Sequence, residues 1–141
     1  MLEKSHDVDR INAAVNHPDV RPFVGPGEDT LDLAPLVARP ENWFLMGEHG
    51  GFALIWSAPR VHEIHTFILP EGRGVWAKEA AQELIAFARK NDDIMVWTKV
   101  PPGQKNVELF TRSAGLKPTG MDVETFDVPY KTYSLELTSC L

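Results

Sequence analysis

Three residues that can exchange protons lie within one short segment, at His62, Glu63 and His65. The segment is rich in β-branched and apolar residues and predicts a strand over 60–69, in which alternate side chains point to opposite faces. Glu63 and His65 would then share one face. A carboxylate or an imidazole placed there can take a proton from a substrate through a water molecule. The alternative is structural: a hydrogen-bonded sheet histidine and a carboxylate at the rim.

The same alternation argues against a metal site. His62 and His65 would point to opposite faces of the strand, so the two imidazoles could not bind one ion. The chain also has a single cysteine, Cys140. One cysteine excludes an internal disulfide framework and a zinc site built from several thiolates. No metal is expected.

A glycine-bearing turn over 70–74 follows the predicted strand and leads directly into an amphipathic helix over 75–90. The first N–H groups of a helix have no partner within it, and the helix dipole is positive at that end. Such a terminus suits a phosphate, so the turn predicts a phosphorylated cofactor. The turn contains neither a Walker loop nor a Gly-x-Gly-x-x-Gly fingerprint. The alternative is a turn that binds nothing.

The composition is that of a soluble globular protein, with 43% hydrophobic and 24% charged residues in 141. This length predicts a single domain, 1–141, with a core of its own. The net charge of −6 disfavours non-specific binding of nucleic acid or of an anionic membrane. The polar first residues predict no signal peptide, and the apolar runs are too short to span a membrane. The expected compartment is the cytoplasm.

Hydrophobic periodicity and turn residues predict alternating helices and strands around this segment. The proline-rich stretch 18–29 predicts a loop, either a plain connector or a substrate-facing segment. The predicted helices are 7–16, 31–39, 75–90 and 106–114, and the predicted strands are 42–47, 51–58, 60–69, 94–100, 123–128 and 132–137.

Strand 60–69, helix 75–90 and strand 94–100 should form a right-handed βαβ unit. The run 94–100 is almost continuously apolar, which is typical of an interior parallel strand. The predicted fold class is therefore α/β, with a mixed sheet that is antiparallel at both ends and parallel in the middle.

This order of elements, with a Pro-Glu-x-Arg-Gly turn between the third strand and a helix, resembles the GNAT superfamily of acyl-CoA N-acyltransferases. The resemblance is strongest to small GNAT-like proteins of tailed bacteriophages. In those proteins a His-Thr strand runs into Leu-Pro-Glu-x-Arg-Gly, and Thr-x-Val-Pro-x-Gly follows the next strand. The corresponding segments here are HTFILPEGRG at 65–74 and TKVPPG at 98–103. The resemblance covers residues 42–120 well and the N-terminal quarter poorly.

The resemblance implies an N-acetyltransferase that uses acetyl-CoA as cosubstrate and acetylates an amine of a small molecule or protein. Acetyl-CoA would lie where strands 60–69 and 94–100 diverge, with pantetheine along the first strand and pyrophosphate on the helix amides. The implied cofactor-binding residues are Phe67, Ile68, Leu69, Arg73, Gly74, Val75, Trp76 and Ala77. A homodimer is compatible with this assignment. A phage-encoded protein would act in the host cytoplasm.

For catalysis, the resemblance implies Glu63 or His65 as the base, since many members carry a base in this region. The usual tyrosine, four residues before the glycine that ends the last helix, is Thr111 here. A threonine is a poor proton donor. Slow transfer is therefore expected, unless Tyr130 or Tyr133 of the last strand region supplies the proton. The predicted catalytic set is Glu63, His65 and Tyr133.

Trp76 departs from the family pattern Gln/Arg-x-x-Gly-x-Gly/Ala, because it stands where a small residue normally allows the backbone to approach the cofactor. Its ring could stack on the cofactor, pack inside or block the cleft. These departures leave a second function open, a catalytically inactive GNAT-fold protein that binds a partner or belongs to a virion. Exposed tryptophans would then form its surface, with Trp43, Trp56 and Trp76 as candidates.

Overall fold

A computed structural model of the protein describes residues 1–137, and Cys140 lies outside them. Its seven strands form one sheet in the order β1-β2-β3-β4-β5-β7-β6. The strands are β1 (Glu3–Lys4), β2 (Trp43–Gly47), β3 (Gly50–Ala58), β4 (Val61–Ile68), β5 (Met95–Val100), β6 (Lys117–Thr125) and β7 (Val128–Glu136). The helices are α1 (Val8–Val15), α2 (Arg21–Val24), α3 (Ala34–Val37), α4 (Val75–Lys90) and α5 (Lys105–Ser113), with a short 3₁₀ helix η1 (Pro70–Gly72).

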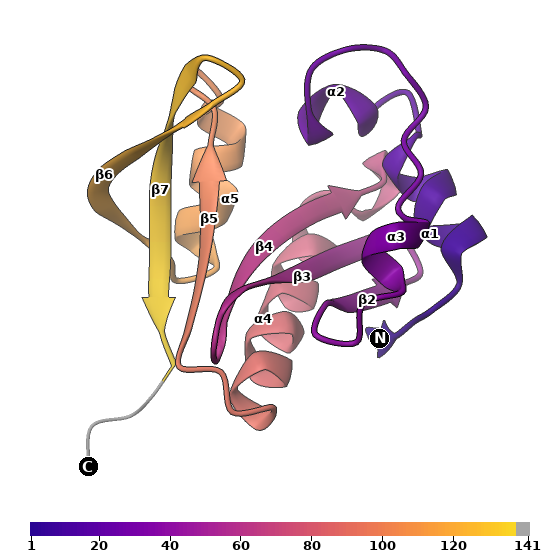
Figure 1. Cartoon of the computed structure of the whole chain (residues 1–141), viewed down its shortest axis with the longest axis horizontal. Helices are drawn as coiled ribbons and strands as arrows, with labels where there is room; N and C mark the ends of the chain where they lie inside the picture. The colour runs from indigo at the N-terminus through magenta and orange to yellow at the C-terminus, as the bar shows by residue number, and fades with distance from the viewer. Residues whose placement is uncertain (138–141) are drawn as a thin grey trace.

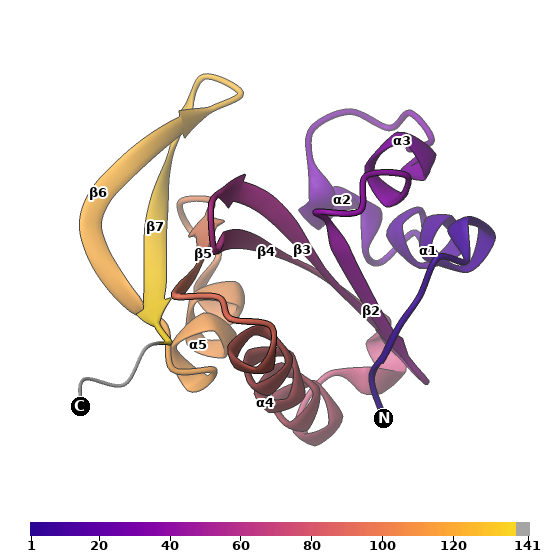
Figure 2. The ribbon, with the colours of Figure 1, turned by 60° about the horizontal axis from the view of Figure 1, so that its bottom comes forward.

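The helices cover both faces of the sheet, as Figures 1 and 2 show. On one face, Leu84 of the long helix α4 and Val96 of β5 belong to the same buried core. The N-terminal helices cover the other face, where Ile11 of α1 belongs to the same buried cluster as Phe67 of β4. Because alternate residues of β4 enter different cores, this strand separates two compartments.

The strands β4 and β5 are parallel neighbours over only part of their length. They pair from Val61 to Glu63 of β4 against Met95 to Trp97 of β5. Beyond that point β5 continues alongside β7 only, and Figure 1 shows it turning away from β4. The other pairings are antiparallel. The predicted mixed sheet, parallel in the middle and antiparallel at both ends, is confirmed.

The N- and C-terminal segments differ from the prediction. The stretch 18–29 contains the short helix α2, and β1 was not predicted. The last hairpin turns at Phe126 and Asp127, both with positive φ, so the predicted strands 123–128 and 132–137 were wrongly bounded. The reason is that β6 is an exposed edge strand, in which side-chain hydrophobicity carries little information about pairing.

No helix within residues 1–137 is at once long enough and apolar enough to cross a membrane.

Candidate active site

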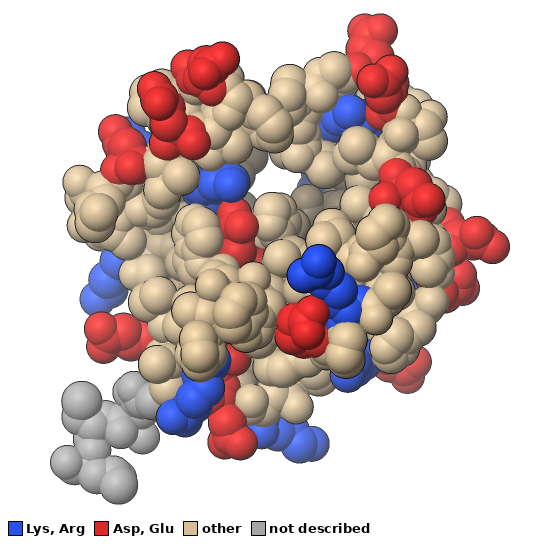
Figure 3. Space-filling model, viewed as in Figure 1, with Lys and Arg blue, Asp and Glu red and all other residues tan. Residues whose placement is uncertain are grey.

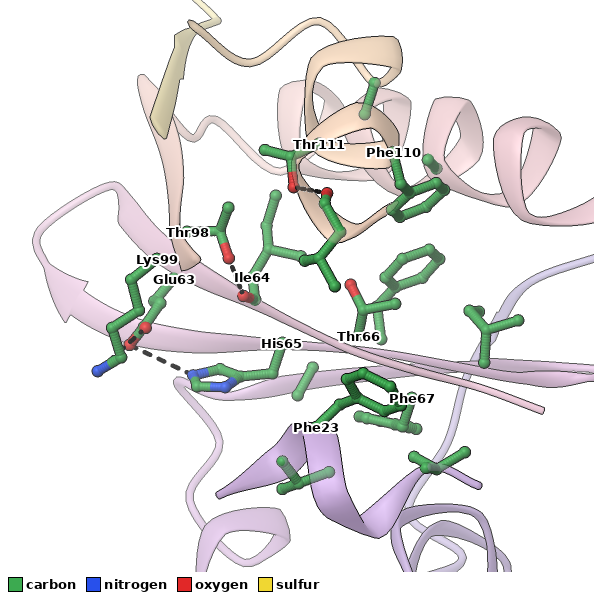
Figure 4. A pocket seen from close by; sticks show the side chains of 18 of the residues that line it. Phe23, Glu63, Ile64, His65, Thr66, Phe67, Thr98, Lys99, Phe110 and Thr111 are labelled. Carbon is green, nitrogen blue, oxygen red and sulfur yellow. Dashed lines mark hydrogen bonds and ion pairs between the residues drawn. The ribbon is translucent and has the colours of Figure 1, made fainter. Parts of the chain in front are cut away.

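A cavity of about 730 Å³ lies where β4 and β5 diverge. Its walls come from both compartments, including Phe67 on the N-terminal helix side and Thr66 and Phe110 on the α4–α5 side. In Figure 4 these two groups lie on opposite sides of β4. Figure 3 shows an opening through the molecule between the β6–β7 hairpin and the α2 region. Two molecules could therefore meet across β4 from opposite sides.

In the part of the chain that the structure describes, the divergence leaves some backbone groups of β4 without a neighbouring strand. The Ile64 carbonyl points toward β5, because it accepts a hydrogen bond from the Thr98 hydroxyl (2.9 Å). The Leu69 N–H points the other way, to the His49 carbonyl (2.9 Å). Since alternate residues of a strand hydrogen-bond to opposite sides, Thr66 and Ile68 turn their backbone groups toward the gap.

Because of this alternation, the backbone groups that face the gap differ from those predicted to pair with pantetheine. Of the three residues expected to pair with pantetheine, only Ile68 presents its backbone to the gap. The backbone groups of Phe67 and Leu69 lie on the β3 side, where Phe67 is in register with Gly51. Thr66 faces the gap and was missed, because its orientation follows from the β3–β4 register rather than from residue type.

The turn before α4 presents unpaired amides. Gly74 is the N-cap, with φ 100° and ψ −128°, a conformation open to glycine. The first helical bond runs from Lys78 N–H to the Gly74 carbonyl (3.1 Å), and no side chain caps this end. The amides of residues 74–77 have no hydrogen-bond partner within residues 1–137. Within residues 1–137, no atom outside Gly74 and its two chain neighbours lies within 4 Å of the position that a Gly74 Cβ would take. These amides are therefore free to hold an anion.

Trp76 packs beneath the β2–β3 hairpin and does not line the cavity. Its ring meets His49 edge to face, with centroids 5.1 Å apart. A Cβ on Gly47 would lie 2.8 Å from the same ring, and one on Gly72 would lie 2.9 Å from it. The two glycines thus leave room for the indole, which neither stacks in the cavity nor blocks it. Gly74 and Ala77 are the small residues that line the cavity at this turn and the start of α4.

Glu63 and His65 come together, as predicted, and Lys99 joins them (Figure 4). Glu63 Oε1 lies 3.3 Å from His65 Nε2, and Glu63 Oε2 lies 3.5 Å from Lys99 Nζ. Burial by itself raises the pKa of Glu63, but its contacts with His65 and Lys99 outweigh burial and hold this pKa below its usual value. The carboxylate is therefore ionised at neutral pH.

Lys99 was not predicted as a site residue. Glu63 pairs with Trp97 across the short parallel ladder, so Lys99, two residues further along β5, falls on the same face beside it. No sequence motif signals this contact. It follows from the register of β4 against β5.

His62 has a structural role on the opposite face. Its Nδ1 lies 2.7 Å from an Asp93 carboxylate oxygen, and its Nε2 lies 2.8 Å from the Glu41 carbonyl. Trp43 stacks on the ring, with centroids 4.1 Å apart. Residues 1–137 contain no cluster of three or more His, Cys, Asp or Glu side chains that could hold a metal ion.

The structure does not bring Tyr133 to Glu63 and His65. Tyr133 is 1% exposed in the core and does not line the cavity. The Arg112 guanidinium lies 5.6 Å from its ring centroid. Burial and the neighbouring Glu108 raise the pKa of the phenol, which makes it a weaker acid. The sequence alone does not show which face of β7 lies against α5. That choice of face places the Tyr133 side chain in the core rather than in the cavity.

Tyr130 is the phenol in the cavity wall, close to the β6–β7 turn. Thr111 also lines the cavity, but it is 6% exposed and its hydroxyl donates to the Val107 carbonyl (2.8 Å). Of the two tyrosines considered as proton donors, Tyr130 is the one that lines the cavity.

No protein-family model and no curated protein matches the chain. Several solved structures match over nearly its full length. A putative acetyltransferase of Salmonella typhimurium, yncA, solved with acetyl-CoA, has 14% sequence identity and a TM-score of 0.76, covering 100% of this chain and 95% of that one. The aminoglycoside acetyltransferase AAC(6')-Ib, solved with paromomycin and acetyl-CoA, has 14% identity and a TM-score of 0.76, with coverage of 96% and 92%.

A spermidine N-acetyltransferase of Vibrio cholerae, solved with CoA and spermine, has 14% identity and a TM-score of 0.68, with coverage of 97% and 95%. Identities this low establish a shared fold and nothing about the acceptor. The chain has the GNAT fold, the fold of these acetyltransferases.

Proposed function

We propose that the protein is an acetyl-CoA-dependent N-acetyltransferase that acts on an amine. One observation carries the proposal: the gap between β4 and β5 joins the free amides of residues 74–77, on one side of β4, to the Glu63–His65 pair on the other. The structural neighbours solved with acetyl-CoA or CoA support the same conclusion.

The residues at the gap fit acetyl-CoA. The amides of residues 74–77 would hold the pyrophosphate, since they are unpaired and at the positive end of α4, where Gly74 and Val75 are exposed. The backbone groups of Thr66 and Ile68 would pair with the pantetheine amides. Bound there, acetyl-CoA supplies an acetyl group activated as a thioester.

The residues on the other side of β4 would manage the protons. An amine is mostly protonated at neutral pH and must lose a proton before its nitrogen can bond to the acetyl carbon. We assign this proton to Glu63, through a water molecule, with the half-exposed His65 passing it to solvent. The carbon–sulfur bond breaks as the carbon–nitrogen bond forms. The departing sulfur takes a proton, which we assign to the Tyr130 phenol. The nitrogen loses its second proton as the amide forms, and this proton restores the phenol through water, so the products are an amide and a thiol.

The test is a titration of acetyl-CoA into CoA-stripped protein, followed by thiol release across a panel of amines. Glu63→Gln should slow release by about 10²-fold or more, the span of general-base catalysis, while acetyl-CoA affinity stays unchanged. Glu48→Gln, an exposed carboxylate beside His49, is the matched control and should resemble the parent. Absence of acetyl-CoA binding would refute the cofactor site. Binding without thiol release from any amine would refute turnover.

The second result would favour an inactive GNAT-fold protein that binds a partner or belongs to a virion, but the tryptophans give that function little support. Trp43 packs against His62 and Trp76 against His49, which leaves only Trp56 of the three exposed, at 47%. The resemblance to phage proteins, the host-cytoplasm location and a homodimer rest on the sequence and stay predictions.

A further inference from the structure

An amine must reach Glu63 from the side of the N-terminal helices. Glu63 and His65 share one face of β4, and Figure 4 shows His65, Phe67 and Phe23 of α2 together on that side. The free amides of residues 74–77 and the gap-facing backbone groups of β4 would bind acetyl-CoA on the other side of the strand. The half of the cavity between β4, α2 and the β6–β7 turn is called the acceptor chamber below. The residues that define it are Phe23, Leu33, Ile55, Phe67, Phe126 and Tyr130.

The acceptor chamber is apolar and contains a single carboxylate. Among the cavity-lining residues that the structure describes, Glu63 is the only acidic one. Its two oxygens already face the cations or potential cations Lys99 and His65, at 3.5 Å and 3.3 Å. A second ammonium group inside the chamber would find no partner, and Lys99 would repel it. The chamber thus suits one ammonium group attached to an apolar body.

The mouth of the chamber is aromatic and bordered by acidic residues. Phe23 of α2 is 55% exposed and Phe126 of the hairpin turn is 62% exposed, although both line the cavity. Figure 3 shows acidic side chains gathered on both sides of the opening. In the chain, the exposed acidic residues Glu28 and Asp29 follow α2, and Glu124 and Asp127 lie around the β6–β7 turn. This border would attract a cation, and the two rings would bind its apolar part.

The α2 side of the mouth is held in place by its own hydrogen bonds. The buried Arg21 donates to the carbonyls of Asp29 (2.9 Å), Gly25 (2.9 Å) and Pro26 (3.3 Å). A Cβ on Gly25 would lie 3.9 Å from the Phe126 ring, so the two sides of the mouth nearly touch. A preorganised entrance lowers the ordering cost of binding, so an apolar group that packs against Phe23 and Phe126 gains more of its contact energy there.

We propose that the acceptor is a monoamine with an aromatic or similarly bulky apolar group, which binds in the chamber between Phe23 and Phe126 with its nitrogen toward Glu63. This inference rests on the proposed acetyl transfer and narrows its substrate class. It differs from the polyamine and aminoglycoside ligands of the structural neighbours.

The first experiment compares 2-phenylethylamine with spermidine and ethylamine as acceptors of the parent protein, by thiol release. We expect kcat/KM for 2-phenylethylamine to exceed that for each of the others by at least ~10-fold, the usual discrimination of an apolar pocket. Isothermal titration of 2-phenylethylamine into the CoA-loaded protein gives a second readout that does not depend on turnover. Preference for spermidine would overturn this inference about the acceptor but leave the proposed acetyl transfer intact. Failure of 2-phenylethylamine to bind the CoA-loaded protein would have the same two consequences.

The second experiment tests the location. Phe23→Ala and Phe126→Ala should each raise KM for 2-phenylethylamine by roughly 10-fold, because each removes an aromatic ring from the mouth of the chamber. Met121→Ala is the matched control, an exposed apolar residue of the same hairpin that does not line the cavity. If the two phenylalanine variants behave like Met121→Ala, the amine does not bind between these rings.

Discussion

Asp93 and His62 form a buried pair at the closed end of the gap, with Asp93 Oδ2 lying 2.7 Å from His62 Nδ1 and both side chains at most 4% exposed. The other ring nitrogen faces the Glu41 carbonyl, so both nitrogens point at oxygen atoms. A neutral imidazole carries one N–H and can donate to only one of these two oxygens. Forming both hydrogen bonds therefore requires one more proton, shared between His62 and Asp93. Burial accordingly raises the pKa of the Asp93 carboxyl, although His62 and Arg60 oppose the shift. The pair joins β4 to the residues that enter β5.

Asp93→Ala should lower the free energy of unfolding by about 3 kcal/mol, because it leaves a buried imidazole without its partner. Asp93→Asn should cost less, since its amide can donate to an unprotonated Nδ1 while Nε2–H still bonds to the Glu41 carbonyl. Urea unfolding measures both variants. Equal losses would mean that the charge of Asp93, rather than its hydrogen bond, stabilises the fold.

The stability contributed by Glu63 should depend on pH with a definite sign. The pKa of Glu63 is lowered in the folded protein from a reference value of 4.5. Its contribution is therefore fully present above that value and is lost as pH falls through the folded pKa. The difference in urea midpoint between parent and Glu63→Gln should shrink as the pH falls below about pH 5, where the carboxylate takes up a proton. Glu79→Gln, an exposed change on α4, controls for general acid effects. A difference that grows in acid would contradict the pairing with Lys99 and His65.

The two tyrosines of β7 should differ in their effect on kcat. Tyr130→Phe should lower kcat by about 10²-fold if Tyr130 protonates the leaving sulfur. Tyr133→Phe should leave kcat near the parent value, because the ring is buried outside the cavity. Thiol release with a good acceptor measures both variants, and equal kcat values for parent and Tyr130→Phe would exclude Tyr130 as the donor.

Two substitutions of Gly74 should distinguish the effect of backbone strain on acetyl-CoA affinity from the effect of charge beside the free amides. Gly74 adopts φ 100° with open space around its Cβ position, so Gly74→Ala tests strain alone. Gly74→Asp adds a negative charge beside the expected phosphates and should weaken acetyl-CoA binding by a further ~1–2 kcal/mol. Calorimetric titration at low and high salt checks this, because screening should reduce the difference. Equal affinities of the two variants would place the pyrophosphate elsewhere.

Much of the fold between residues 60 and 100 could be predicted from the sequence, because the hydrophobic pattern and the turn residues of each segment indicate the same element. The alternation of 60–69, the glycines at 72 and 74 and the amphipathic run of 75–90 predict strand, turn and helix with boundaries close to those observed. The apolar run of 94–100 predicts the parallel partner for the same reason. Glu63 and His65 were placed on one face by the two-residue period of a strand alone.

Other features of the site were decided only by the tertiary structure. They depend on the register between strands and on which face of a strand packs inward, and no local sequence pattern encodes either. The β3–β4 register turned Thr66 rather than Phe67 or Leu69 toward the gap, and the β4–β5 register brought Lys99 to Glu63. The exposed edge strand β6 carries too little hydrophobic contrast to locate its turn, so the fold alone placed Tyr130 in the cavity and Tyr133 in the core. A one-residue slip exchanges the two faces of a strand, which is why long-range packing must settle these positions.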